Sequence, residues 1–272
     1  MLVKDGGMSS LRPQDSHRAR EVAESFGSDA ERYDRARPSY PDALIEKVLA
    51  EAPGKAVLDV GVGTGIVARQ FLQRGCTVLG VDPDARMAAQ ATATGVEVEI
   101  ATFESWEPAG RRFDAAVAGM TWHWVDPVAG AAKAQRVLVE GGLLALFWNV
   151  AQAPRELDEG FAEVFRRIVP EVPAYSAGDR AGRAYDAFLD KAADGMRTAG
   201  GFGRPEIWRF DWDLDYTREA WLDHVPTSGG FSRIDPKRQQ ALLEGIGEVL
   251  DRAGGHFTMH WTTATIACHT ES

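Results

Sequence analysis

The sequence predicts an α/β fold with a mostly parallel sheet, and two observations support this class. Apolar runs of strand length alternate with stretches in which apolar residues recur at helical spacing. The strand-like runs are apolar throughout, as in "AVLDV" at residues 56–60, which is typical of strands covered by helices on both faces. Parallel neighbours need crossover connections, and the intervening helices supply them with right-handed geometry.

The first half of the chain is expected to contain two N-terminal helices, then five strands and three helices. A short helix stops before Pro38, and a second is opened by Pro41 and ended by Pro53 and Gly54. Gly75 supplies a left-handed cap for the helix after the first strand. The expected strands are 56–60, 76–82, 96–102, 113–120 and 143–149, and the three helices are 65–75, 83–95 and 127–142 with its turn.

The alternation changes after residue 150. Apolar residues at helical spacing predict a helix over 154–169, and a looser region rich in Ala, Gly and Asp, to about residue 203, indicates further helix with breaks. Asp235 as a cap and Pro236 in the first turn predict a later helix. The remaining expected elements are strand 206–217, helices 218–225 and 235–255, and strand 256–269.

Composition narrows the class of partner. The 272 residues, 44% of them hydrophobic, suffice for one large domain with an appendage or for two small domains. The net charge of −10 disfavours nucleic acid and anionic membranes as partners and favours a small molecule. Two distant cysteines indicate neither a disulfide framework nor a metal site, and no secretory signal or membrane span is evident. We expect a cytoplasmic protein; the oligomeric state, a homodimer included, stays open.

Three glycines after the first strand indicate a ligand at the start of the next helix. Gly61, Gly63 and Gly65 allow close approach to the backbone, whose free N–H groups meet polar atoms. The dinucleotide fingerprint needs a glycine where Ile66 stands, and the loop lacks the lysine of a phosphate-binding P-loop. A carboxylate at Asp59 would repel a pyrophosphate and suit an ammonium group.

"VLDVGVGTG" and "VLGVDPDARM" resemble the first and second motifs of the class I S-adenosylmethionine-dependent methyltransferases. The resemblance implies a Rossmann-like seven-stranded, mostly parallel sheet with an antiparallel last strand, and S-adenosylmethionine as cofactor with S-adenosylhomocysteine as product. It implies that the glycine loop lies along the methionine moiety and that Asp59 contacts its amino group. Asp82 would accept both ribose hydroxyls. The resemblance also places four residues beside the adenine and one at the end of the fourth strand against the cofactor: Pro83, Met87, Thr102, Phe103 and Met120.

"FGSDAERYDRARPSYP" and "TWHWVDP" are similar to segments of methyltransferase type 11, in particular the trans-aconitate methyltransferase-like small-molecule group. In these relatives the N-terminal segment closes over the cofactor. The resemblance therefore puts Tyr33 near the sulfonium and Arg37 near the carboxylate, which a guanidinium binds with two hydrogen bonds. The alternative is a structural arginine that pairs with a nearby acidic residue, Asp29, Glu31 or Asp34.

Methyl transfer needs a positioned nucleophile more than a cluster of catalytic groups, because the cofactor brings its own electrophile. His123 follows the fourth strand, where ligands bind in open α/β sheets, and is the candidate base; an orienting or packing role is the alternative. Aromatic side chains at strand ends and hydroxyls in the Gly-rich loop "VPTSGGF" are the candidate acceptor contacts: Trp122, Trp124, Trp148, Thr227 and Ser228.

The resemblance implies a methyltransferase that acts on an O, N, S or C nucleophile of a small organic acceptor. The expected organisation is a flexible tail (1–20), an N-terminal access segment with the cofactor-binding core (21–150), a helical lid insert (151–203) and the C-terminal part of the core sheet (204–272). The alternatives are a non-methylating enzyme that uses the same cofactor, a cofactor-binding module without turnover, and a nicotinamide-dependent oxidoreductase, which Ile66 disfavours.

Overall fold

A computed structural model describes Gly27 and residues 29–171 and 179–271. The described strands form one seven-stranded sheet in the order β3-β2-β1-β4-β5-β7-β6. β1 to β5 run parallel, whereas β7 lies antiparallel between β5 and β6, which confirms the predicted mostly parallel sheet with an antiparallel last strand. The strands are β1 (Ala56–Val60), β2 (Thr77–Asp82), β3 (Glu97–Ile100), β4 (Phe113–Gly119), β5 (Leu138–Gln152), β6 (Glu206–Thr217) and β7 (His256–His269).

Most predicted helices are present close to their expected bounds. The α-helices are α2 (Ala30–Ala36), α3 (Asp42–Glu51), α4 (Ile66–Leu72), α5 (Ala85–Ala93), α6 (Pro127–Val137), α7 (Arg155–Ile168), α8 (Asp179–Ala199), α9 (Arg218–His224) and α10 (Pro236–Arg252). Short 3-10 turns are η3 (Trp122–Trp124), η4 (Val225–Thr227) and η5 (Phe231–Arg233). None of the described helices is long and apolar enough to cross a bilayer.

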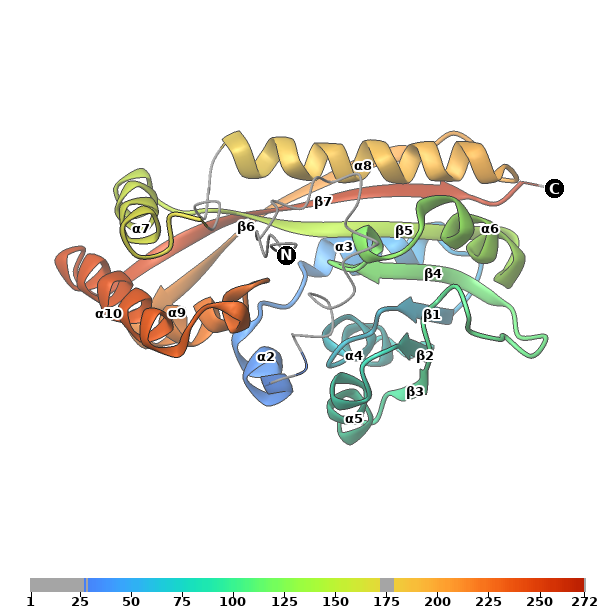
Figure 1. The fold of residues 1–272 in the computed structure, drawn as a ribbon. Helices are drawn as coiled ribbons and strands as arrows, with labels where there is room; N and C mark the ends of the chain where they lie inside the picture. The colour runs from blue at the N-terminus through green and yellow to red at the C-terminus, as the bar shows by residue number, and fades with distance from the viewer. Residues whose placement is uncertain (1–26, 28, 172–178, 272) are drawn as a thin grey trace, which may run out of the picture.

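Helices cover both faces of the sheet, as its apolar strands require. On one face α3, α4 and α5 pack through Leu44, Phe71 and Ala91. On the other face α6 and α8 contribute Ala134 and Leu189, and Figure 1 shows α8 running along the long strands β5 and β7. The sheet therefore leaves the strand ends as its accessible edge.

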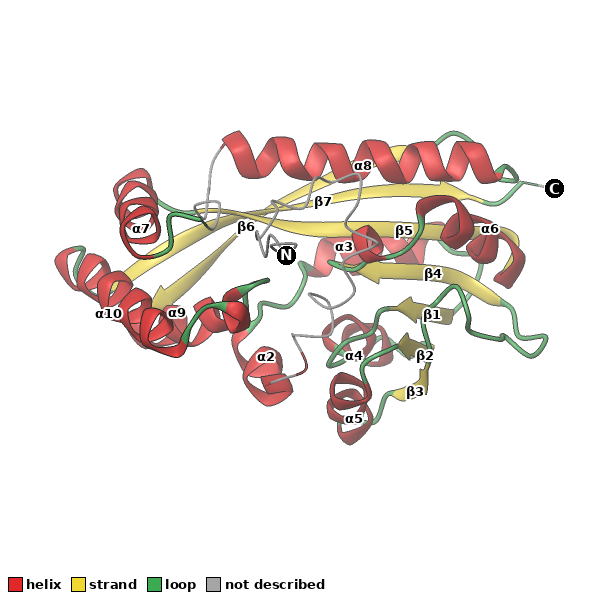
Figure 2. Ribbon diagram, viewed as in Figure 1, coloured by secondary structure: helices red, strands yellow, loops and turns green. Residues whose placement is uncertain are grey.

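A third apolar cluster lies at one end of the long strands. It joins α7, α9 and α10 to the β6 and β7 residues at that end, with Phe161, Trp221 and Leu250 among its members. Figure 2 shows these three helices gathered beyond the short strands β1 to β3. The predicted tail, residues 1–20, lies outside the described residues, and the division into a lid insert and a C-terminal part of the core stays a prediction.

Candidate active site

A cavity of about 520 Å³ lies along the carboxyl edge of the sheet, within the size range of small-molecule sites. Its walls follow the strand order. They run from Asp82 at the end of β2, past Gly61 after β1 and Met120 after β4, to Asn149 on β5 and Trp261 on β7. The access helix α2, the helix α8, and α9 with the loop after it complete the lining.

The glycine loop needs its glycines for different reasons. Gly61, Gly63 and Gly65 have φ of 68°, 55° and 86°, a region that side chains disfavour. Gly61 and Gly63 line the cavity. Gly65 does not: a Cβ there would lie 3.2 Å from the Ala91 Cβ, so this glycine lets α5 approach the start of α4.

Replacing Gly61 with alanine should destabilise the protein more than its backbone angle alone explains. A Cβ at this position would lie 2.0 Å from Cγ2 of Thr121. Gly95 is a matched control, because its φ is 91° and a Cβ would meet nothing within 4 Å. We expect Gly95→Ala to cost about 1–2 kcal/mol of unfolding free energy, and Gly61→Ala at least about 3 kcal/mol, measured by urea denaturation. Equal losses would contradict the steric argument.

Asp82 joins the glycine loop to the loop after β2. Its side chain is buried, with 8% exposure. Oδ2 accepts from the Gly63 N–H and Oδ1 from the Asp84 N–H, each at 2.8 Å. Burial raises the pKa of Asp82, while these two backbone N–H groups oppose that shift. The carboxylate thus orients the loop and lines the cavity.

Asp59 carries a buried oxygen without a hydrogen-bond partner among the described residues. Its side chain is 1% exposed, and Oδ2 has no hydrogen-bond partner within the described part of the chain. Burial, and after it the Asp82 charge, raises the pKa of Asp59 to about 8. Because Asp59 also lines the cavity, an ammonium group bound there would supply both the missing donor and the charge that favours the ionised carboxylate.

The access segment reaches the cavity through Tyr33 and Arg37. The Arg37 guanidinium lies 5.1 Å from the Tyr33 ring centre, and Nη2 donates to the Thr227 carbonyl at 2.5 Å. Arg37 Nε is buried without a partner among the described residues. Two of the three anticipated acidic partners are engaged elsewhere, since Asp29 pairs with Arg32 and Asp34 with Arg69.

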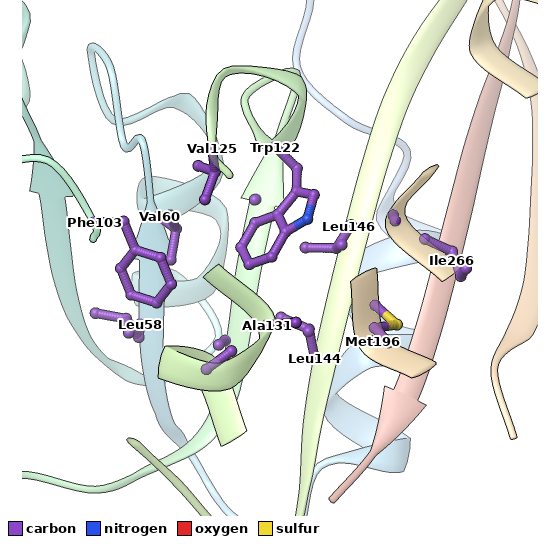
Figure 3. Packing of buried hydrophobic residues seen from close by; sticks show 14 of the residues in the cluster. Leu58, Val60, Phe103, Trp122, Val125, Ala131, Leu144, Leu146, Met196 and Ile266 are labelled. Carbon is purple, nitrogen blue, oxygen red and sulfur yellow. The ribbon is translucent and has the colours of Figure 1, made fainter. Parts of the chain in front are cut away.

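The other predicted site residues divide into two groups. Residues at the cavity wall are Pro83, Met87, Thr102, Phe103, Met120, His123, Trp124 and Ser228. Trp122 lies instead in the core between the sheet and α6, as Figure 3 shows among Val125 and Leu146. Trp148 and Thr227 are also absent from the cavity wall: Trp148 is fully buried, and the Thr227 hydroxyl donates to the His224 carbonyl at 2.6 Å.

His123 has a geometry that favours orientation over proton removal. The Trp148 indole donates to His123 Nδ1 at 3.2 Å, and an indole N–H can only donate. Nδ1 is therefore the lone-pair nitrogen, and the neutral ring carries its hydrogen on Nε2. Burial, and after it the charge of Lys191, lowers the pKa of His123 to about 3. The lone pair that a base would use is already engaged by the indole.

Sequence reasoning missed several wall residues: Tyr40, Asn149, Ala151, Tyr185, His224 and Trp261. Asn149 ends the apolar run of the fifth strand, a position that resembles Asp82 on the second, so this signal was readable. His224 and Trp261 gave no such signal. They reach the cavity only because α9 packs against the access helix α2 and β7 inserts beside β5.

Comparisons with known proteins agree with this fold and reveal a match to a methyltransferase domain. Residues 57–142 match the family model for a methyltransferase domain. An uncharacterized methyltransferase of Mycobacterium tuberculosis is 37% identical over 132 residues, which cover 48% of this chain and 54% of the relative. The malonyl-[acyl-carrier protein] O-methyltransferase of Pseudescherichia vulneris is 29% identical over 155 residues, 55% of this chain and 61% of that protein. The chain thus spans about half to three fifths of these relatives.

A solved structure supports the fold over a longer stretch. A protein from Anaeromyxobacter dehalogenans, proposed to be a type II methyltransferase, superposes with a TM-score of 0.62 at 22% identity. The superposition covers 85% of this chain and 97% of the other. Residues 57–142 thus match a methyltransferase domain, and the strand order and the glycine loop with its two carboxylates are consistent with that match.

Proposed function

We propose that this chain transfers the methyl group of S-adenosylmethionine, by direct displacement, to an O, N, S or C nucleophile of a small organic acceptor. The observation that carries the proposal is the unpartnered Asp59 oxygen on the cavity wall beside the glycine loop. A buried acceptor without a donor fits an amino group, and Asp82 one strand away fits a vicinal diol.

In this proposal the chain binds the cofactor, orients it toward the acceptor and shields the reacting groups from water. Gly61 and Gly63 would lie along the methionine moiety, Asp82 would hold the ribose, and Arg37 would take the carboxylate with its unpartnered Nε. The wall residues near the adenine are Pro83, Met87, Thr102 and Phe103. The bound cofactor supplies an electrophilic methyl on a sulfonium, so the enclosing wall's task is to align a nucleophile and exclude water.

Isothermal calorimetry tests the proposal. We expect S-adenosylmethionine and S-adenosylhomocysteine to bind with micromolar order Kd, and methyl-labelled cofactor to pass its label to a small acceptor. Absence of binding would refute the site. Binding without label transfer would favour the non-methylating alternative, and tight NADH binding in a fluorescence titration would favour the oxidoreductase.

A further inference from the structure

The part of the cavity over β5 and β7 has no role in the proposed cofactor site. Four strand spacings of about 4.8 Å separate β2 from β7, so Trp261 stands about 19 Å along the sheet from Asp82. Among the residues at the strand ends, the proposed cofactor contacts stop at Met120 after β4, whereas Arg37 of the access segment reaches this part of the cavity through the Thr227 carbonyl. The remaining wall includes Trp124, Asn149, Tyr185, His224, Ser228 and Trp261, and these six residues are here named the acceptor subsite.

His224 lines this subsite, and its hydrogen-bond partner fixes which ring nitrogen carries the hydrogen. Its Nδ1 lies 3.1 Å from the Ala36 carbonyl oxygen, which can only accept, so Nδ1 carries the hydrogen and Nε2 the lone pair. The ring stacks on Trp221 at 4.8 Å with an interplanar angle of 10°, which holds its orientation. Burial, and after it the charge of Arg37, lowers the pKa of His224 to about 3, so the ring is neutral at neutral pH.

Asn149 presents a hydrogen-bond donor by the same kind of argument. The Trp212 indole donates to the Thr263 hydroxyl at 3.0 Å. That hydroxyl must then give its own hydrogen to Asn149 Oδ1, 2.7 Å away. With Oδ1 engaged on the side of Thr263, the amide group left for a ligand is Nδ2, a donor.

Apart from Ser228, the rest of the subsite is aromatic. Rings of Trp124, Tyr185 and Trp261 line it, and the walls offer flat apolar surface around His224 and Asn149. An acidic acceptor is disfavoured at His224, because an ionised carboxylate has no hydrogen to give to the lone pair of Nε2.

We propose that the acceptor subsite binds a small aromatic hydroxyl compound, a phenol, whose O–H donates to His224 Nε2 while a neighbouring oxygen accepts from Asn149 Nδ2. This inference rests on the proposed function. In the transfer, the phenol oxygen forms the new bond to the methyl carbon, the electron pair of the broken carbon–sulfur bond stays on sulfur, and the hydroxyl proton passes to Nε2 and then to solvent. If the phenol oxygen is methylated before it loses its proton, the resulting oxonium is a far stronger acid than an imidazolium, so its proton passes readily to the His224 ring. A weakly basic ring therefore suffices.

Small probes test the assignment without a known acceptor. With the protein saturated by S-adenosylhomocysteine, the affinities of catechol, its dimethyl ether veratrole, and benzoate are measured by ligand-observed NMR titration. We expect catechol to bind at least about tenfold tighter than the other two. His224→Phe should remove that preference, His224→Gln, which keeps an acceptor oxygen, should retain part of it, and the exposed control His256→Gln should change nothing.

The outcomes separate the two proposals. Failure of the wild type to bind S-adenosylhomocysteine would overturn the proposed function itself. If S-adenosylhomocysteine binds normally, three results would overturn the acceptor assignment alone. These are equal affinity for catechol and veratrole, a preference for benzoate, and no catechol binding. Calorimetry with S-adenosylhomocysteine on each variant also shows whether the variant has kept its fold.

A second readout concerns the ring itself. Nitrogen-15 NMR of histidine-labelled protein should show His224 protonated on Nδ1 only, with the signal assigned by its loss in His224→Gln. Catechol should shift the Nε2 resonance. A ring protonated on Nε2 at neutral pH would overturn the proposal.

Discussion

Replacing Asp82 with alanine is expected to lower the affinity for S-adenosylhomocysteine at least about a hundredfold. The carboxylate has two functions that the variant loses together. It is the proposed acceptor for both ribose hydroxyls, and it holds the N–H groups of Gly63 and Asp84. Hydrogen bonds to a charged group contribute about 1.5–3 kcal/mol each, and about 1.4 kcal/mol corresponds to tenfold in affinity.

The measurement is calorimetry against two references. Glu97→Ala removes an exposed carboxylate from β3 and should bind like the wild type. Asp82→Asn keeps one acceptor oxygen, and its affinity for S-adenosylhomocysteine should lie between those of the wild type and Asp82→Ala. An Asp82→Ala protein that binds S-adenosylhomocysteine as well as the wild type would show that the cofactor lies elsewhere.

Replacing Asp59 with asparagine should make the free protein more stable at mildly alkaline pH while weakening cofactor binding. The folded pKa of about 8 lies far above the value of about 3.9 in unfolded chains. The folded state therefore binds the extra proton between these values, and wild-type stability falls as pH rises through that window. Asparagine carries no charge, so Asp59→Asn should gain on the order of a few kcal/mol near pH 8 and little near pH 4.

The affinity for S-adenosylhomocysteine should depend on pH in the opposite direction to the stability of the free wild-type protein. An ammonium beside Asp59 favours its ionised form, so wild-type binding of S-adenosylhomocysteine should release a proton near neutral pH and strengthen as pH rises toward about 8. Calorimetry in buffers with different ionisation enthalpies measures that proton. Asp59→Asn should bind at least about tenfold more weakly and release none. The stability prediction is checked by thermal unfolding of Asp59→Asn near pH 4 and near pH 8, with Asp211→Asn as the exposed control. An Asp59→Asn protein less stable than the wild type near pH 8 would contradict the buried-charge argument.

Local patterns in the sequence predicted many element boundaries because each depends on neighbouring residues. Strands 56–60, 206–217 and 256–269 have the predicted bounds, since their apolar patterns are bounded by turn residues. The fifth strand is longer than predicted, 138–152 instead of 143–149. Both extensions come from pairing, because β7 continues beside β5 as far as Gln152 opposite His260, and at the other end Leu138 pairs with Phe113 of β4.

The sequence by itself determined the parallel core, the glycine loop and the two carboxylates beside it, because Asp59 and Asp82 lie within strands whose ends share one edge of the sheet. Tertiary structure alone decided which way the polar side chains are presented. The Nδ1 lone pair of His123 accepts from Trp148, on the next strand, whereas Nδ1 of His224 is held by the carbonyl of Ala36, 188 positions earlier in the chain, which puts the lone pair of that ring on Nε2. A tautomer depends on a partner across space, and no local pattern of residues encodes it.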